Sequence, residues 1–304
     1  MGMLDGKVVA VTGAGNGLGR AYSAALAAAG AAVVCSDVDG TAAERVAREV
    51  RAVGGRAVGR GDDVGQWGTG EALAAGAVTE FGKLDVLVNN AGVLRDRMMW
   101  NLTESDLDDV YRVHLKGTFA CTVALVRHLR EREAGGAVIN VISAAHQGHP
   151  GQSNYAAMKG AIASATYTWA IELARYGIRV NAISPMAWTA MTQTTAKDEA
   201  AAKVIAERLG PPERVAPTVV FLASDEAAYV TGQILGACNE RISLLIHPRE
   251  ARHAFCLGGW TAEEIARRFR GGTGQVLEPC GSQPQYPWYD GVHPEPRPQP
   301  ASAD

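Results

Sequence analysis

The chain has 304 residues, of which 47% are hydrophobic and 20% are charged, a composition typical of a globular protein with a sizeable core. Its formal net charge of −3 excludes the strongly basic surface of nucleic-acid-binding proteins, so no nucleic-acid partner is expected. Its five cysteines are scattered without a CxxC spacing, which predicts reduced thiols in a cytoplasmic protein and no metal site.

The N-terminal stretch MGMLDGKVVAVTG lacks a basic segment before its short apolar run, so it does not resemble a targeting signal. The alanine-rich run from Ala21 to Cys35 is interrupted by Gly30 and is too short for a membrane span. We therefore expect a soluble, cytoplasmic protein with no membrane partner.

Short β-branched runs alternate with alanine-rich helical stretches along the chain. Strands are expected at residues 8–12, 32–37, 56–60, 86–89, 137–143, 179–184 and 233–235, and helices are expected to begin near residues 17, 41, 65, 103, 154 and 212. Nearly unbroken apolar strands such as VVAV are buried on both faces, which requires helices on each side of a parallel sheet. The predicted fold is α/β, with a doubly wound parallel sheet.

One domain is expected over residues 1–270, including a substrate loop at 186–209 whose MAWTAMTQTTAK stretch is small and largely apolar. Before the end of this domain, TAEEIARRFR predicts a short helix with Thr261 as N-cap and Glu264 completing a capping box. From residue 271 to 304 frequent proline and glycine predict an irregular or disordered tail.

A glycine-rich loop, TGAGNGLGR at residues 12–20, follows the first expected strand and opens the first expected helix. Glycine allows a pyrophosphate to approach the backbone, and the helix N-terminus supplies free N–H groups and a positive dipole end. This context favours a dinucleotide site over a plain turn.

Asp37 ends the second expected strand, 18 residues beyond Gly19, where a carboxylate can accept hydrogen bonds from both ribose hydroxyls of an adenosine. A 2′-phosphate about 4 Å from this carboxylate would cost on the order of 4 kcal/mol per unit charge at an effective dielectric constant near 20. Asn16 is uncharged, and Arg20 on the helix does not remove Asp37. The cofactor is therefore predicted to be NAD.

Six motifs stand in a characteristic order: TGAGNGLG, DV at 63–64, NNAG at 89–92, VIS at 141–143, YAAMK at 155–159 and RVNAISP at 179–185. On these motifs the sequence is identified as a member of the short-chain dehydrogenase/reductase family over about residues 4–245. The resemblance implies a Rossmann fold, oxidoreductase activity on a secondary alcohol or its ketone, and a homodimer or homotetramer.

The catalytic chemistry also follows from the residue types. Oxidising an alcohol requires a base for the hydroxyl proton, and a free tyrosine with a pKa near 10 is a poor base at neutral pH. Lys159 lies one helical turn after Tyr155, and its positive charge favours the phenolate. The resemblance implies that Tyr155 is the general acid/base, that Lys159 also holds the nicotinamide ribose, and that Ser143 orients the substrate.

The resemblance further implies a set of cofactor-binding residues. Asn90, Ala91 and Gly92 would flank the adenosine ribose, Asp63 and Val64 the adenine, and Pro185 and Thr189 the nicotinamide. With the loop and catalytic residues the set is Gly13, Asn16, Gly17, Leu18, Gly19, Asp37, Asp63, Val64, Asn90, Ala91, Gly92, Tyr155, Lys159, Pro185 and Thr189.

Three positions depart from the family pattern. His114 stands where the family usually carries an asparagine; either a backbone carbonyl satisfies it, or it joins the proton relay and makes activity sensitive near its pKa. The interval from Ser143 to Tyr155 is one residue shorter than usual, and Met186 replaces a glycine beside the nicotinamide.

VHLKGTF, RDRMMWNLTESD and VTGQILG resemble the (3R)-hydroxyacyl-CoA dehydrogenase branch of the family, which includes 17β-hydroxysteroid dehydrogenase type 4. The expected substrate is a 3-hydroxyacyl-CoA or a steroid-like alicyclic alcohol, with Arg95, Arg97 and Lys197 as candidate partners of coenzyme A. Two alternatives stay open: an NADPH-dependent 3-oxoacyl carrier-protein reductase, and a dinucleotide-binding protein without turnover.

Overall fold

The computed structural model describes residues 2–189, 192, 198–250, 252–269 and 271–274. Eight strands form one sheet in the order β3-β2-β1-β4-β5-β6-β7-β8, and every neighbouring pair is parallel except β7 and β8. The strands are β1 (Val8–Thr12), β2 (Ala32–Asp37), β3 (Arg56–Gly61), β4 (Val86–Asn89), β5 (Gly136–Val141), β6 (Ile178–Met186), β7 (Ile234–Cys238) and β8 (Arg241–Leu245). The predicted doubly wound α/β fold is confirmed.

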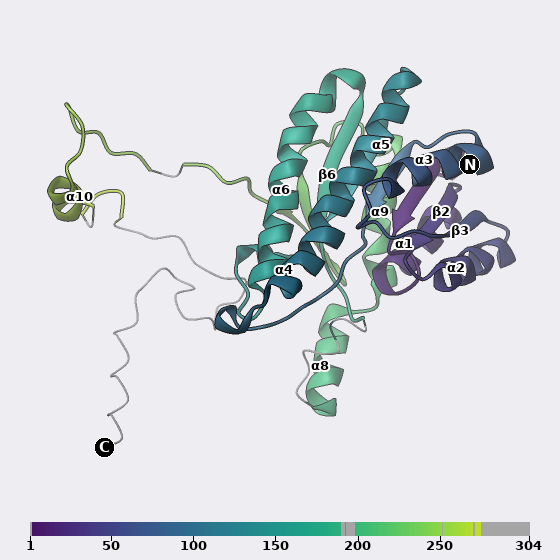
Figure 1. Ribbon diagram of the computed structural model, residues 1–304, viewed down its shortest axis with the longest axis horizontal. Coiled ribbons are helices and arrows are strands. Elements are labelled where there is room, and N and C mark those ends of the chain that lie inside the picture. Colours follow the sequence, from purple (N-terminus) through teal and green to yellow (C-terminus); the bar gives the residue numbers. More distant parts are fainter. Residues whose placement is uncertain (1, 190–191, 193–197, 251, 270, 275–304) are drawn as a thin grey trace.

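Helices cover both faces of this sheet (Figure 1). The main helices are α1 (Gly17–Ala28), α2 (Gly40–Ala52), α3 (Thr69–Phe81), α4 (Glu104–Val110), α5 (Gly117–Glu131), α6 (Ser153–Leu173), α8 (Glu199–Leu209), α9 (Ala216–Ala223) and α10 (Ala262–Arg268). A π-helical segment, η2 (Tyr111–Lys116), joins α4 to α5, and 3₁₀ turns include η1 (Met99–Asn101) and η3 (Ala144–Gln147). Helices α1, α2 and α9 pack on one face, whereas α3, α5 and α6 pack on the other.

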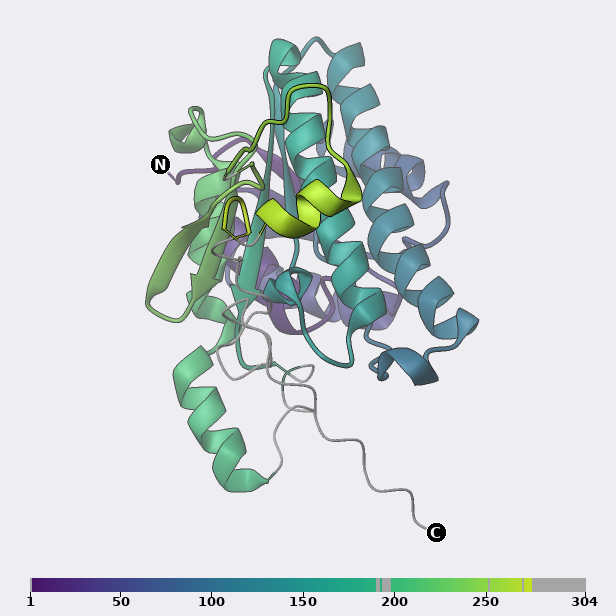
Figure 2. The same cartoon turned by 90° about the vertical axis from the view of Figure 1, so that its left-hand side faces the viewer.

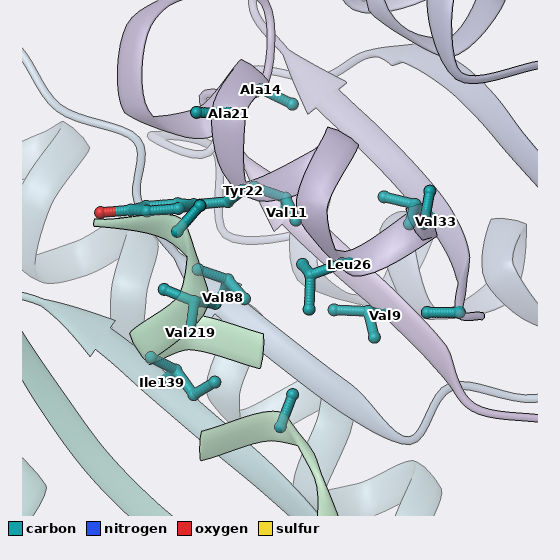
Figure 3. Close-up of a cluster of buried hydrophobic side chains, with 14 of the residues drawn as sticks. Val9, Val11, Ala14, Ala21, Tyr22, Leu26, Val33, Val88, Ile139 and Val219 are labelled. Carbon is teal, nitrogen blue, oxygen red and sulfur yellow. The ribbon is translucent and has the colours of Figure 1, made fainter. Parts of the chain in front are cut away.

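The core is two apolar layers, one on each face of the sheet. The strands alternate between them: Val9 and Val11 of β1 belong to one layer, and Val8 and Ala10 belong to the other. Figure 3 shows the first layer, in which Tyr22 of α1 is fully buried with its oxygen at the edge of the labelled group. That hydroxyl has no hydrogen-bond partner in the described part of the chain.

Two elements were not predicted from the sequence. Strand β8 pairs antiparallel with β7 because Asn239, at a positive φ of 46°, turns the chain back after Cys238. Helix α8 is capped at its N-terminus by Asp198, whose side chain accepts a hydrogen bond from the N–H of Ala201. In Figure 1 α8 projects below the sheet.

Parallel strands bring their carboxyl ends to one edge, and the predicted site residues follow those ends. The glycine loop follows β1, Asp37 ends β2, Asp63 follows β3, Asn90 follows β4, and Ser143 follows β5. Within the described residues no helix is long and apolar enough to span a membrane. The predicted tail lies mostly outside the described residues, as does Lys197 of the substrate loop.

Candidate active site

The glycine loop leaves no space for a side chain at Gly13 or Gly19. A Cβ on Gly13 would lie 2.8 Å from the Cα of Ala91, and one on Gly19 would lie 2.0 Å from the carbonyl oxygen of Gly13. Gly13 and Gly17 also have positive φ values of 64° and 51°, which favour glycine. The loop therefore exposes backbone directly before the N-terminus of α1.

Asp37 lies against this loop. Its Oδ2 accepts a 2.9 Å hydrogen bond from the N–H of Gly15, and its Oδ1 accepts one of 3.0 Å from Asp39. The guanidinium of Arg45 on α2 donates to the carbonyl of Gly15 at 2.8 Å and to Oδ1 of Asn16 at 3.0 Å. Sequence reasoning missed Arg45, because only folding brings α2 beside the loop.

Arg20, which the sequence analysis placed on the first helix, directs its side chain away from the glycine loop. It forms a 2.7 Å ion pair with Glu49 of α2. Arg45 is therefore the basic side chain that contacts the glycine loop.

Asn90 and Thr12 join the loop to β4. The side-chain amide of Asn90 donates to the carbonyls of Thr12 and Gly13, each at 3.0 Å. The Thr12 hydroxyl accepts hydrogen bonds from the backbone N–H groups of Asn90 and Ala91 at 3.0 and 3.1 Å. Thr12 is a positioning residue that the sequence analysis left out, although it begins the TGAGNGLG motif.

Asp63 is fixed after β3. It accepts hydrogen bonds from the N–H of Gly65 at 2.9 Å and from Arg112 at 2.6 Å. Burial raises the pKa of this carboxyl, but the bonds from Gly65 and Arg112 outweigh burial, so the net pKa is lowered. Val64 beside it is buried against Gly117.

Tyr155 lies in the first turn of α6, partly buried beside Ser143. Burial raises the pKa of the Tyr155 phenol, the hydrogen bond with the Ser143 side chain lowers it, and the charge of Asp96 raises it, with a net rise. The Ser143 oxygen also accepts a 3.2 Å hydrogen bond from the N–H of Ala145. The shortened interval thus still brings serine and tyrosine together.

Lys159 is one turn further along α6 and is buried. Its ammonium donates a hydrogen bond to the carbonyl of Val141 in β5 and lies 5.6 Å from the centroid of the Tyr155 ring. Burial lowers the pKa of Lys159 to about 7. A tyrosinate and this ammonium would each stabilise the other's charged form.

His114 lies in the π-helical segment η2 and is 1% exposed. Its Nε2 is 3.0 Å from the N–H nitrogen and 2.8 Å from the carbonyl oxygen of Val93, and its Nδ1 has no partner among the described residues. Its ring meets that of Tyr155 edge to face, with centroids 5.2 Å apart. A Cβ on Gly92 would lie 2.5 Å from Cε1 of His114, so the loop after β4 is fitted to this imidazole.

Burial and, less strongly, the charge of Lys159 lower the pKa of His114, the bond to Val93 opposes both, and the net pKa is about 3. The low pKa keeps the His114 imidazole neutral near neutral pH, and its part in a proton relay stays a prediction. The carbonyl contact that the sequence analysis considered is present.

Pro185 and Met186 end β6, and Thr189 follows in the described part of the substrate loop. The N–H of Thr189 donates to the Thr192 hydroxyl at 2.7 Å. A Cβ on Gly17 would lie 3.7 Å from Cγ2 of Thr189, so the residue borders the glycine loop. Thr189 therefore brings the described part of the substrate loop against the glycine loop.

The residues fit a dinucleotide. Exposed loop backbone lies at a helix N-terminus beside a carboxylate, and a lysine and a tyrosine follow at the carboxyl ends of the central strands. Among the described residues no group of His, Cys, Asp and Glu side chains could hold a metal ion. The arrangement can bind a dinucleotide and transfer a proton at Tyr155.

Comparison with known proteins agrees. A family model described as Enoyl-(Acyl carrier protein) reductase matches residues 13–238. The hydroxyacyl-CoA dehydrogenase ChsB1 of Mycobacterium tuberculosis is 39% identical over 283 residues, which cover 88% of each chain. A solved short chain dehydrogenase from Mycobacterium avium superposes with a TM-score of 0.82 at 39% identity, over 91% of this chain and 98% of that one.

The chain is a short-chain dehydrogenase/reductase. It is therefore an oxidoreductase that acts on CH–OH groups with a nicotinamide dinucleotide, NAD or NADP, as cofactor. The predicted family is confirmed, and the alternative of a binding protein without turnover is not supported.

Two further relatives of this short-chain dehydrogenase/reductase represent different branches. Mouse peroxisomal multifunctional enzyme type 2 is 40% identical over 230 residues, 73% of this chain but 30% of the larger protein. The 3-oxoacyl-[acyl-carrier-protein] reductase FabG of Thermotoga maritima is 38% identical over 238 residues, 77% of this chain and 96% of that one. The percentages of identical residues alone do not decide to which of these branches the chain belongs.

Proposed function

We propose that this short-chain dehydrogenase/reductase uses NAD to interconvert a secondary alcohol and its ketone, with a 3-hydroxyacyl-CoA or a steroid-like alicyclic alcohol as substrate. The observation that carries the choice of cofactor is the Asp37 carboxylate, held against Gly15 at the end of β2. It would accept hydrogen bonds from the adenosine ribose and repel a 2′-phosphate. The similarity to ChsB1 over 88% of both chains supports the substrate class.

In the oxidative direction the Tyr155 phenolate accepts the proton of the substrate hydroxyl. Ser143, whose side chain lies beside Tyr155 and lowers its pKa, holds the substrate oxygen beside the base. The Lys159 ammonium stabilises the phenolate, and the bond to Val141 fixes its position. The glycine loop and Asp37 would hold the dinucleotide, whose oxidised nicotinamide would supply the acceptor for the hydride of the carbinol carbon.

The groups proposed for coenzyme A need revision. Arg95 forms a 2.9 Å ion pair with Asp109, and Arg97 forms a 2.6 Å ion pair with Asp106. Both guanidiniums therefore already neutralise carboxylates of the chain, and Lys197 lies outside the described residues. The proposed substrate class rests on the relatives and not on these cations.

The second candidate is an NADPH-dependent 3-oxoacyl carrier-protein reductase. Arg45, which contacts both Gly15 and Asn16, is the observation that favours it, because a guanidinium beside the loop could pair with a 2′-phosphate. Asp37 accepts a hydrogen bond from the N–H of the same glycine, so its negative charge and the positive charge of Arg45 favour different cofactors.

Replacing Asp37 with alanine is expected to raise kcat/KM for NADP relative to NAD between about tenfold and a thousandfold, because the repulsive carboxylate is removed while Arg45 remains. The wild-type enzyme is expected to prefer NAD. Absorbance of the reduced nicotinamide measures both, with a (3R)-hydroxyacyl-CoA, a 17β-hydroxysteroid and cyclic alcohols as substrates. Asp225→Asn, which removes an exposed carboxylate paired with Lys7, is the control for net charge. A wild-type preference for NADP would contradict the proposal and favour the reductase.

His114 is proposed as a positioning residue that holds the Val93 backbone beside Tyr155. We expect His114→Leu to lower kcat by about tenfold or more, because the Val93 N–H loses its acceptor, whereas His114→Asn should retain most of kcat since an amide both donates and accepts. The pH profile of the wild-type enzyme should have no inflection near pH 6.5 that is due to His114. The profile of His114→Asn should therefore have the same shape in that range. A purely structural histidine would instead lower the Tm of His114→Leu and leave kcat unchanged.

A further inference from the structure

Helix α6, which carries Tyr155 and Lys159, begins without the side-chain cap that commonly starts a helix. Its N-cap residue is Gln152, whose side chain makes no capping hydrogen bond among the described residues. The amide of Gln152 instead donates a 2.9 Å hydrogen bond to Oδ2 of Asp96, in the segment that follows β4. The first turn of α6, which contains Tyr155, is therefore fixed by other groups.

Asn154 bonds the N–H of the catalytic tyrosine. Asn154 is 1% exposed, and its Oδ1 accepts a 2.8 Å hydrogen bond from the N–H of Tyr155. Its Nδ2 donates to two carbonyls, that of Arg95 after β4 and that of Asp106 in α4, each at 3.1 Å. One buried amide thus joins the backbone of Tyr155 to two neighbouring segments, and its removal would leave buried groups unpaired.

Residues 95–97 also contact the start of α6 through the backbone. The N–H of Arg97 donates to the carbonyl of Gly151 at 2.8 Å, and Arg97 forms an isolated parallel β-bridge with Gln152. Figure 2 shows α6 side by side with the continuous helical segment made of α4, η2 and α5, and both α4 and η2 contact α6. The start of α6 and the segment after β4 therefore form one hydrogen-bonded unit.

The catalytic residues are held from two sides. Lys159 is anchored to β5 by its bond to the carbonyl of Val141, and Ser143 directly follows the same strand. Tyr155 lies one turn before Lys159, and its backbone is anchored through Asn154 to the segment after β4. Without Asn154 the first turn of α6 could shift relative to β5 while Lys159 stays in place, so the distance from the phenol to the substrate oxygen would change.

We propose that Asn154 is a positioning residue, which holds the first turn of α6, and thereby the phenol of Tyr155, against the segment after β4. It acts through Tyr155 and not on the reacting atoms. The role is the same for any secondary alcohol and for either nicotinamide dinucleotide, so the inference does not rest on the proposed substrate or cofactor.

Asn154→Ala is expected to lower kcat about tenfold to a hundredfold, because a small misplacement of a catalytic group is costly. The Kd of the preferred cofactor should not change, since the glycine loop keeps its contacts. Absorbance of the reduced nicotinamide measures kcat, with the alcohol of the panel above that the wild-type enzyme oxidises fastest. Asn154→Ser, whose side chain is too short to reach both carbonyls, should lose kcat to a similar extent and replaces the alanine variant if that variant does not fold.

Asp85→Ala is the matched control. Asp85 is also buried and also anchors backbone, since it accepts a 2.9 Å hydrogen bond from the N–H of Val8, but it precedes β4 at the opposite edge of the sheet. It should lower Tm at least as much as Asn154→Ala and leave kcat unchanged. A lower Tm of Asn154→Ala with the kcat of the wild type would overturn the proposal, because Asn154 would then only support the fold.

Amide hydrogen exchange is a second readout and needs no substrate. Exchange within residues 93–98 and 152–157 should be about tenfold faster in Asn154→Ala than in the wild type, because hydrogen bonds that hold these segments are lost. Asp85→Ala should leave it unchanged there, and unchanged exchange in Asn154→Ala would contradict the proposal. If the wild-type enzyme oxidises none of the alcohols, the proposed substrate class fails, and the exchange rates alone decide the role of Asn154.

Discussion

Replacing Tyr155 with phenylalanine is expected to lower kcat at least about a hundredfold in either direction, because general acid–base catalysis contributes roughly 10²–10⁴-fold. The substitution removes one oxygen and keeps the ring that packs on His114. NAD affinity and Tm should therefore stay close to those of the wild-type enzyme. Initial rates at saturating cofactor, a binding titration with NAD and a thermal melt measure the three quantities.

The pH dependence of the wild-type enzyme provides a second measurement of the same role. Because burial raises the pKa of the Tyr155 phenol, the phenolate forms toward alkaline pH, and kcat/KM for oxidation should rise with pH in the alkaline range. Tyr229→Phe, which removes the hydroxyl of an exposed tyrosine, is the matched control and should be fully active. Activity of Tyr155→Phe within tenfold of the wild type would reject Tyr155 as the acid/base.

Replacing Lys159 with methionine is expected to abolish turnover and, at the same time, to stabilise the fold. The folded pKa of about 7 lies below the ordinary lysine pKa of 10.5, because burial disfavours the charged form. Each pKa unit corresponds to about 1.36 kcal/mol. Loss of the hydrogen bond to Val141 offsets part of the gain, and on the order of 1–3 kcal/mol of added stability should remain below pH 7.

The sign of the pH dependence follows from proton binding. Between pH 7 and 10.5 the unfolded chain holds the lysine proton and the folded chain does not, so the stability of the wild-type protein rises with pH across this window. Lys159→Met removes this contribution, and its gain should be larger at pH 6 than at pH 9. Urea unfolding at both values measures the difference, and exposed Lys203→Met is the control. A destabilised variant at pH 6 would show that Lys159 supports the fold.

The relative placement of the catalytic tyrosine and lysine could be predicted from a short stretch of sequence. Tyr155 and Lys159 are four residues apart on one helix, and local hydrogen bonding of that helix brings both side chains to one face. The order of strands and helices was likewise readable, because buried parallel strands are short apolar runs between alanine-rich helices. Strand β8 could not be predicted from the sequence. Its alternating pattern forms a strand only because the turn at Asn239 brings it antiparallel to β7.

The fold class, the family and the residue types that carry the chemistry could thus be predicted from the sequence, because they depend on local periodicity and on fixed spacings within single elements. The environment of those residues emerges only when distant segments pack together. Arg45 reaches the glycine loop from α2, Val93 meets His114 across 21 positions, and burial moves the pKa of Lys159 to about 7. Solvent exclusion and contacts between distant segments set these properties, and neither is encoded in the spacing of neighbouring residues.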